Sequence, residues 1–339
     1  EQYTPAVKLV RQSTVDELMR YSVEVDFSRS TTRPDELSRL VDDARQVDGG
    51  HAQDGAENRA EEGGDHHGAD DDGDVALDHA ERGDDGQWAG GAHFPKAEPA
   101  LPGQPWTSTS HVLTELRLLG VDPADAAMRS VIADVARVTR WEYDDLPFFD
   151  GEVEPCINAA LVANAVYYGV DVAPVVERLL GERMEDGGWN CEQERGSVRS
   201  SFDTTIAVVE ALAAFERISD DLRVPEARRS GEAYLLERSL LRRRSTGELI
   251  SEGYRDFAFP PRWHYDALRA LEHFRVVGAA PDERMAEAIA LVRAKRRDDG
   301  TWPLDARHGG DARIDYGEVG EPNRWITLRA LRVLRWAGE

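Results

Sequence analysis

Apolar residues recur at helical spacing in five segments of this chain, and each segment is also rich in small side chains. The segments begin near Trp106, Cys156, Phe202, Trp263 and Trp325. Apolar residues three and four positions apart form one face of an α-helix. Because small side chains allow helices to approach closely, we expect these five helices to form a crowded inner layer.

More charged segments follow the inner helices, at about 124–140, 174–185, 225–244 and 281–297. Arg and Glu occupy one face of these segments, which is typical of an outer layer. Turn signals that combine Gly with Asp or Pro separate the two kinds of helix, as in Gly-Val-Asp-Pro at residues 120–123. The sequence therefore predicts an all-α fold in which inner and outer helices alternate about five times.

One turn motif returns three times, each time before a new apolar helix. Residues 84–88, 186–189 and 298–302 read Asp-Asp-Gly-Gln-Trp, Asp-Gly-Gly-Trp and Asp-Asp-Gly-Thr-Trp. Gly permits the left-handed backbone that stops a helix, and Trp can pack into the seam between neighbouring units. A unit that repeats in this way buries its apolar face against its neighbours. No capping repeat is evident, so we expect a closed ring of about five to six helical hairpins.

This pattern resembles the prenyltransferase and squalene-cyclase repeat superfamily. The matching features are the Asp-Gly-x-Trp turns, the small-residue inner helices and the unit length, and they span residues 84–339, about three quarters of the chain. The resemblance implies an α/α toroid over 84–339 with an apolar cavity that accepts an isoprenoid. Such toroids host protein prenyltransferases, terpene cyclases, thioester domains and lyases, so the chemistry stays open.

Residues 41–83 have a different composition from the rest of the chain. The stretch 41–87 holds 16 Asp and Glu against 3 Arg, which accounts for 13 of the 24 net negative charges. With almost no large apolar side chains, 41–83 is predicted to be disordered. The alternatives are a metal-binding acidic tail that uses its histidines, and a reading-frame error in a GC-rich gene. Residues 1–40 are assigned no structure.

Charge and hydropathy limit the partners and the location. The excess of negative charge argues against nucleic acid, and no apolar run is long enough to span a membrane, although peripheral membrane contact stays open. Residues 1–10 lack the apolar stretch of a signal peptide. With only two cysteines, Cys156 and Cys191, the chain is expected to be cytoplasmic.

In a ring of this kind, the starts of the inner helices and the loops before them surround one mouth of the cavity. Aromatic faces there would stabilise a carbocation formed from an isoprenoid. The residues predicted to line the cavity are Trp106, Phe148, Phe149, Trp263, Tyr265, Trp325 and Arg324. The predicted catalytic groups are Asp150, Asp203, His264 and Asp266.

The resemblance to protein prenyltransferases implies a zinc site made of Asp, Cys and His. Cys156 and His264 would supply two ligands, and Asp150 is the first choice for the third, with Asp203 and Asp266 as alternatives. The alternative interpretation is that Cys156 and His264 are structural. Cys191 is given no role, because a complement-type thioester needs a Gln three residues after its Cys, and Gln193 lies two after Cys191.

Two further chemistries are weighed. Terpene cyclases protonate an alkene with the middle Asp of Asp-x-Asp-Asp-Thr, and the nearest stretch here, residues 200–204, reads Ser-Ser-Phe-Asp-Thr and lacks that Asp. A raised pKa at Asp150 or Asp203 could compensate, but Asp203 is also well placed to cap a helix. The acidic loop 144–154 could hold Mg²⁺ for a diphosphate, with Arg262 and Arg324 as its cations.

The sequence leans towards an enzyme of the cyclase or prenyltransferase type, cyclase-like but without the usual proton donor, and zinc and magnesium are its candidate cofactors rather than requirements. The main alternative is a non-catalytic toroid that binds a lipid or a protein partner.

Overall fold

The computed structural model describes residues 82–83 and 85–339. Residues 82–118 and 122–339 form one compact unit. The predictions for 1–40, and for 41–83 apart from Arg82 and Gly83, lie outside the described residues. Within the described residues, no helix is both long enough and apolar enough to cross a membrane.

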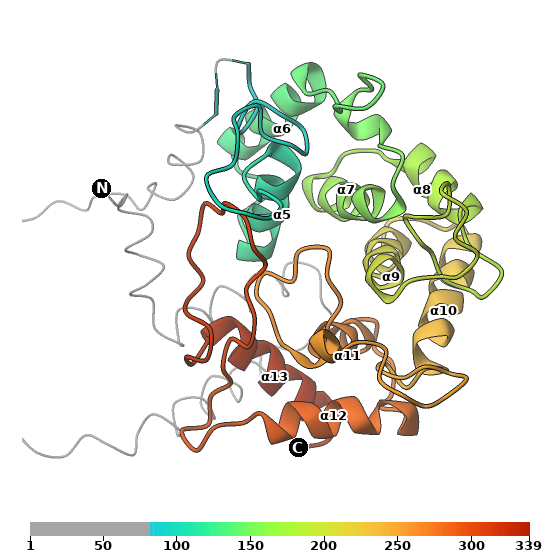
Figure 1. Cartoon of the computed structure of the whole chain (residues 1–339). Coiled ribbons are helices and arrows are strands. Elements are labelled where there is room, and N and C mark those ends of the chain that lie inside the picture. The colour runs from blue at the N-terminus through green and yellow to red at the C-terminus, as the bar shows by residue number, and fades with distance from the viewer. Residues whose placement is uncertain (1–81, 84) are drawn as a thin grey trace, which may run out of the picture. The chain divides into compact units, whose positions relative to one another are not determined.

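The five inner helices predicted from the sequence are all present, and Figure 1 labels them. They are α5 (Thr109–Leu119), α7 (Pro155–Tyr168), α9 (Phe202–Glu216), α11 (Ala267–Val276) and α13 (Arg324–Trp336). Two begin later than predicted. Trp106 lies in an extended loop before α5, and the Asp266 side chain caps α11 by accepting the backbone N–H of Arg269 at 2.7 Å.

The outer helices are α6 (Ala126–Val138), α8 (Ala173–Gly181), α10 (Arg223–Leu236) and α12 (Ala286–Ala294). Short 3₁₀ helices lie at η1 (Phe148–Asp150), η2 (Glu252–Arg255) and η3 (Glu283–Met285). The prediction of one helix over 225–244 was too long. The backbone adopts positive φ at Ser239 and Leu240, 44° and 62°, and this turn buries the Leu240 side chain. The described residues contain isolated β-bridges but no strand, so the all-α prediction is confirmed for them.

The three Trp turns share one backbone anchor. Each contains a glycine with positive φ, at Gly86 (73°), Gly187 (97°) and Gly300 (84°). The backbone N–H of the turn Trp then donates to a Thr hydroxyl in the first turn of the next inner helix. The pairs are Trp88 with Thr109 at 3.2 Å, Trp189 with Thr205 at 3.1 Å and Trp302 with Thr327 at 3.0 Å. All three Trp side chains are fully buried.

Two of these tryptophans are also held by the preceding outer helix. The indole N–H of Trp189 donates to the Leu179 carbonyl in α8 at 2.7 Å, and that of Trp302 donates to the Val292 carbonyl in α12 at 2.6 Å. The large ring thus fills the space between an outer and an inner helix while its polar atom stays paired. The repeat motif therefore joins successive helical pairs.

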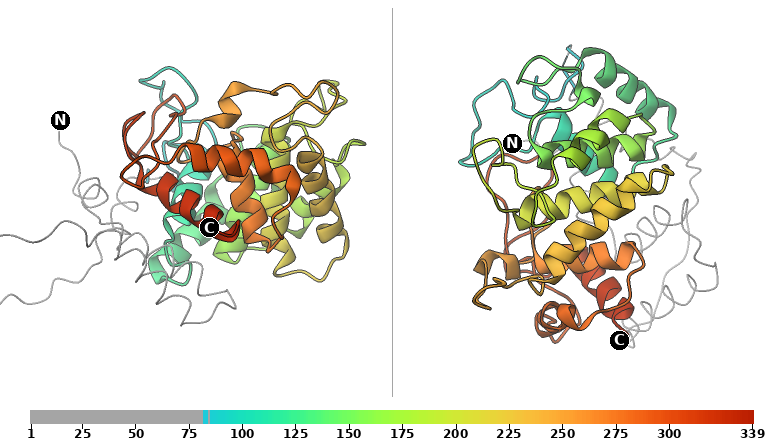
Figure 2. Two further views of the ribbon diagram at one scale, coloured as in Figure 1. Left: turned by 90° about the horizontal axis from the view of Figure 1, so that it is seen from below. Right: turned by 90° about the vertical axis from the view of Figure 1, so that its right-hand side faces the viewer.

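The helices predicted as inner either pack against one another or are linked by side chains. Helix α7 lies beside α9, and α11 beside α13, while α10 packs on α9 (Figure 2). Helices α5 and α7 are linked by Asn164, which accepts from Arg117 Nε at 2.8 Å and donates to the Thr114 hydroxyl at 2.9 Å. Helices α9 and α11 are linked by the ion pair of Glu210 and Arg269, with 2.6 Å between Oε2 and Nη2.

The loop before α13 is bonded to the loop before α5. The Asp311 carboxylate accepts the backbone N–H groups of Ala100 and Leu101 at 2.7 and 3.0 Å, and its carbonyl accepts that of Trp106 at 2.7 Å. A Cβ atom at Gly310 would lie 1.9 Å from the Gln104 carbonyl oxygen, so this contact requires glycine. The first and last inner helices are therefore joined through their entry loops.

Candidate metal centre

Cys156 lies in the first turn of α7. Pro155 occupies the first turn, where its missing N–H and fixed φ are tolerated, and Glu154 is the residue that precedes the helix. The Cys156 side chain is half-buried. This start of α7 therefore presents a carboxylate and a thiol two residues apart.

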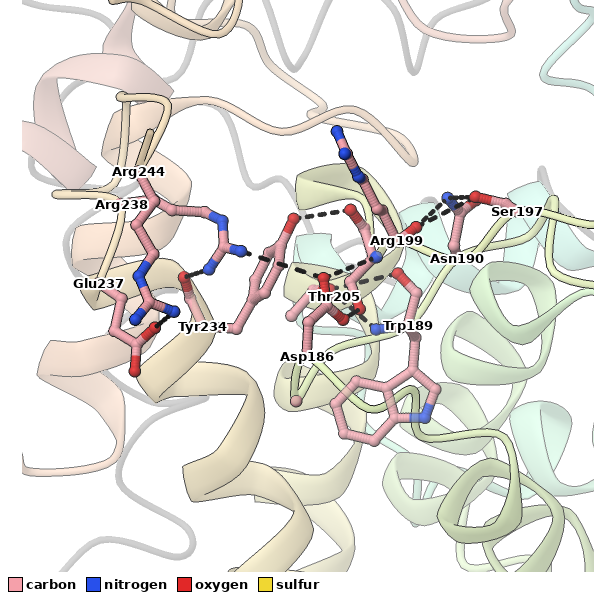
Figure 3. A network of polar contacts seen from close by, with 12 residues as sticks. Asp186, Trp189, Asn190, Ser197, Arg199, Thr205, Tyr234, Glu237, Arg238 and Arg244 are labelled. Atoms are coloured by element: carbon pink, nitrogen blue, oxygen red, sulfur yellow. Dashed lines mark hydrogen bonds and ion pairs between the residues drawn. The ribbon is translucent and has the colours of Figure 1, made fainter. Parts of the chain in front are cut away.

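Cys191 comes from the loop that follows the second Trp turn, and hydrogen bonds fix that loop (Figure 3). The Asn190 amide donates to the Ser197 hydroxyl at 3.0 Å and to the Arg199 carbonyl at 2.6 Å. The Ser200 carbonyl accepts from the Tyr234 hydroxyl of α10 at 2.7 Å. These hydrogen bonds fix both sides of the loop, and the loop places Cys191 beside the start of α9.

The two sulfurs meet at the starts of α7 and α9. The Sγ atoms of Cys156 and Cys191 are 2.7 Å apart, and Oε2 of Glu154 lies 3.6 Å from the Cys156 sulfur. Among the described residues, these three side chains form the group whose ligand atoms all lie within 4.8 Å of one another. The Thr204 hydroxyl of α9 adds a donor 3.4 Å from the Cys191 sulfur.

Neighbouring groups shift the pKa values of the two thiols in opposite directions. The hydrogen bond from Cys156, together with that from Thr204, lowers the pKa of Cys191. The neighbouring Cys191 sulfur, and then burial, raise the pKa of Cys156. The two shifts run in opposite directions, so Cys191 is the more acidic thiol of the pair.

The donor set fits zinc better than magnesium. Thiolates are soft ligands that suit Zn²⁺, and three protein ligands are the usual number in a catalytic zinc site, where the fourth position is open. Two thiolates on one tetrahedral zinc ion lie about 3.8 Å apart, because each Zn–S bond is about 2.3 Å. From their present distance of 2.7 Å, the sulfurs would have to separate by about 1 Å to take those positions.

The predicted zinc ligands are not brought together. Cys156 is in the cluster, but neither Asp150 nor His264 belongs to it. Asp150 ends η1 and is exposed. His264 is stacked between Trp263 and His308, with ring centroids 3.6 and 3.9 Å away. Burial lowers the pKa of His264, and the Asp203 carboxylate opposes that shift.

The other two predicted catalytic acids both have structural partners. Asp203 lies in the first turn of α9 and accepts the Tyr265 backbone N–H at 2.7 Å and the Tyr254 hydroxyl at 3.1 Å. The N-cap of α9 is Ser201, so Asp203 holds the segment before α11 rather than capping its own helix. Asp266 caps α11 and is 2 % exposed, and burial raises its pKa.

The aromatic side chains predicted to line a cavity differ in exposure. Trp106, Phe148 and Tyr265 are buried, Phe149 and Trp325 are half-buried, and Trp263 is 41 % exposed. Phe148 stacks on Trp141 with 4.8 Å between ring centroids, and Trp325 stacks on Phe259 with the same separation. Several of these rings therefore already pack against a protein ring.

The two arginines predicted to bind a diphosphate stand in different surroundings. Arg262 forms an ion pair with Glu115 at 2.8 Å, and the exposed fraction is 6 % for the first side chain and 4 % for the second. The Arg262 guanidinium also lies 5.0 Å from the centre of the Trp106 ring. Arg324 begins α13 and is half-buried. Arg262 is therefore committed to an internal ion pair.

The sequence interpretation missed Cys191, and it included Glu154 only as part of the acidic loop 144–154 that could hold Mg²⁺. A usable signal existed, since Cys191 follows a repeat Trp by two residues, and a repeat turn precedes the start of an inner helix. In this structure the position lies against the first turn of the neighbouring helix α7, which contains Cys156. In comparisons with known proteins, no family model matches this chain and no curated protein matches it.

Proposed function

We propose that the described unit is an α/α toroid that acts as a zinc-dependent enzyme of the prenyltransferase type on an isoprenoid. The single observation that carries the proposal is the cluster of Glu154, Cys156 and Cys191 at the starts of two adjacent inner helices. The isoprenoid and the toroid come from the resemblance of the turns and inner helices to that superfamily.

Three sets of contacts support closure of the ring. Inner helices are linked in chain order, α5 to α7 through Asn164 and α9 to α11 through Arg269. Helix α7 packs on α9, and helix α11 packs on α13. The hydrogen bond to the Asp311 carboxylate then joins the loop before α13 to the loop before α5. The helices follow one another in chain order in Figure 1, as a ring requires.

The proposed metal ligands are Glu154, Cys156 and Cys191. When bound there, zinc would supply Lewis acidity that activates a thiol or a water molecule at neutral pH. Thr204 would stabilise the Cys191 thiolate by hydrogen bonding to its sulfur. Glu154 would balance the charge of the ion, and its position before α7 fixes its distance from Cys156.

The cyclase alternative has less support than the zinc enzyme. Asp203 accepts two hydrogen bonds, so its carboxylate is committed to Tyr254 and Tyr265 rather than free to protonate an alkene. Asp266 is a buried acid with a raised pKa, which is the property a proton donor needs, but it caps α11. The magnesium alternative has less support as well, because two of the three clustered ligands are sulfurs.

The experiment that tests the proposal is a metal analysis of the full chain combined with native mass spectrometry. We expect about one zinc ion per chain in the wild type, lost in Cys156→Ser and Cys191→Ser and bound more weakly in Glu154→Gln. Glu194→Gln is the matched control, since Glu194 lies in the loop of Cys191, is exposed and is outside the cluster. It should keep its zinc.

The other outcomes separate the alternatives. A wild-type protein that takes up no zinc when both thiols are reduced contradicts the proposal. If that metal-free protein carries a co-purified lipid, the proposed zinc enzyme gives way to a non-catalytic toroid that binds a lipid. Zinc that persists in the Cys191→Ser variant would remove Cys191 from the ligand set.

A further inference from the structure

Cys156 and Cys191 are the only cysteines of the chain, and the fold brings them together. They lie 35 positions apart in the sequence, yet their Sγ atoms are 2.7 Å apart. A disulfide within one chain can therefore link no other pair. Because a disulfide holds its sulfurs about 2.05 Å apart, these two would have to approach by only roughly 0.7 Å to form one.

The backbone that carries each sulfur is held by its own contacts. Cys156 lies in the first turn of α7, and α7 packs against α9. The Cys191 backbone N–H donates to the Thr204 hydroxyl of α9 at 3.3 Å. The Trp189 turn just before it is anchored to Thr205 of the same helix at 3.1 Å. The fold thus supplies one thiol to the other at a high effective concentration, with no flexible segment to order first.

A small molecule can reach this pair from solution. Both cysteine side chains are half-buried rather than enclosed in the core. Beyond Cys191 the loop runs over the surface, where residues 192–196 are all exposed. The sulfurs are therefore accessible to an oxidant of the size of a low-molecular-mass disulfide.

The reaction with such a disulfide takes two exchange steps. In the first, one cysteine thiolate attacks the small disulfide, forms a mixed disulfide and releases one small thiolate. In the second, the other cysteine attacks the protein sulfur of the mixed disulfide, and the second small thiolate leaves. The Glu154 carboxylate, with Oε2 3.6 Å from the Cys156 sulfur, accepts the proton that Cys156 gives up. In total the cysteines lose two electrons and two protons, and the small disulfide becomes two thiols.

We infer that Cys156 and Cys191 form a reversible disulfide with a small-molecule disulfide as oxidant, and that this bond excludes zinc from their cluster with Glu154. Zinc needs both sulfurs as thiolates about 3.8 Å apart, whereas the disulfide bonds them at about 2.05 Å. The two states are therefore mutually exclusive. The disulfide itself needs no metal, and only the exclusion of zinc rests on the proposed function.

The test starts from the reduced, metal-free full chain, which is incubated with oxidised glutathione. The reaction is stopped with acid, free thiols are alkylated under denaturing conditions, and the intact mass is measured. We expect a product that has lost the mass of two hydrogen atoms, takes up no alkylating agent and returns to its starting mass with dithiothreitol. Cys156→Ser and Cys191→Ser are the matched controls, and each should stop at a mixed disulfide with one glutathionyl group.

A denatured control separates the native contact from the general chemistry of a dithiol. In concentrated urea the two cysteines are joined only by a flexible chain, whereas the fold holds their sulfurs together. The equilibrium constant for disulfide formation with glutathione should therefore be about tenfold or more higher for the folded protein. By linkage, oxidation should then raise the urea midpoint. Equal constants in the two states would overturn the inference, and so would a disulfide that links two chains instead of closing within one.

Zinc release distinguishes the failure of this inference from the failure of the proposed function. In the zinc-loaded protein, disulfide formation should release an equal amount of zinc, measured with a chromogenic chelator, and dithiothreitol should let it bind again. Zinc that stays bound after the disulfide has formed contradicts the exclusion. A reduced protein that binds zinc but forms no disulfide overturns the inference and leaves the proposed function intact. A protein that forms the disulfide but takes up no zinc when reduced contradicts the proposed function and leaves the disulfide standing.

Discussion

The second and third Trp turns have the same anchor but different residues after it. In both, the Trp backbone N–H donates to a Thr hydroxyl of the next inner helix, and the indole N–H donates to the last turn of the preceding outer helix. After Trp189 the chain continues with Asn190 and Cys191, and the sulfur reaches Cys156. After Trp302 it continues with Pro303 and Leu304, and the leucine is 1 % exposed.

This difference separates the structural role of the repeat from the chemistry of the candidate site. The anchor fixes where the backbone leaves the turn, and the residue two positions after the Trp then points into the molecule. A leucine at that position adds to the core, whereas a cysteine meets a second cysteine. The candidate chemistry therefore comes from one substitution on a structural repeat, and three predictions test that separation.

The largest loss of stability is expected when the tryptophans of these two turns are replaced. Trp189→Ala and Trp302→Ala each remove a fully buried ring, so each should lower the free energy of unfolding by about 3–5 kcal/mol. Urea denaturation followed by circular dichroism measures this. Similar losses at the two positions would support equivalent structural roles, and a loss below about 1 kcal/mol at either would contradict them.

A smaller effect is expected from the Thr hydroxyls, and here the two turns should diverge. Thr205→Val and Thr327→Val each leave a buried Trp N–H without its acceptor, at a cost of about 1–2 kcal/mol. Only Thr205→Val should also weaken zinc binding, because Cys191 follows the Trp189 turn. Thr205→Ser keeps the hydroxyl and serves as the control. Equal zinc affinities in both Val variants would show that the turn does not position Cys191.

The smallest effect concerns the first turn, which is followed by a histidine. His93 comes five residues after Trp88 and contacts the Ser110 hydroxyl at 3.1 Å, and burial lowers its pKa to about 4. Between the unfolded value of about 6.5 and about 4, the unfolded chain binds a proton that the folded chain does not. Stability attributable to His93 is thus complete above pH 6.5 and falls as the pH drops toward 4.

We expect this loss to be about 1 kcal/mol, because the side chain is only half-buried. Urea denaturation of the metal-free protein between pH 4.5 and 7.5 measures it, and His93→Gln should flatten the curve. If the stability of His93→Gln still fell with pH as steeply as that of the wild type, the pH dependence would come from other titratable groups.

Much of the fold could be predicted from the sequence because its signals are local. Apolar spacing located the five inner helices, and the recurrent Gly and Trp located the turns. The helix ends were less accurate where tertiary contacts decide them. Residues near 240 were predicted to continue α10, but the Leu240 carbonyl accepts the Tyr265 hydroxyl at 2.6 Å from the segment before α11.

The candidate site was harder to predict because its members are distant in sequence. Cys156 could be selected as a rare ligand type, but nothing local says that Cys191, 35 residues away, is its neighbour. His264 was an equally reasonable choice by residue type, and stacking against Trp263 and His308 holds it elsewhere. Asp203 looked like a proton donor or a helix cap, and its two Tyr partners come from residues more than 50 positions later.

The bond between the loop at Asp311 and the segment around Ala100 has a consequence for how the protein is made. A ribosome delivers the chain from its N-terminus, and an ordinary linear repeat array can assemble as each unit emerges. Here the entry to the first inner helix obtains its backbone partners only when residues 309–313 have been synthesised. The nascent chain therefore lacks these partners for the loop before its first inner helix until residues 309–313 have emerged, about 200 residues later.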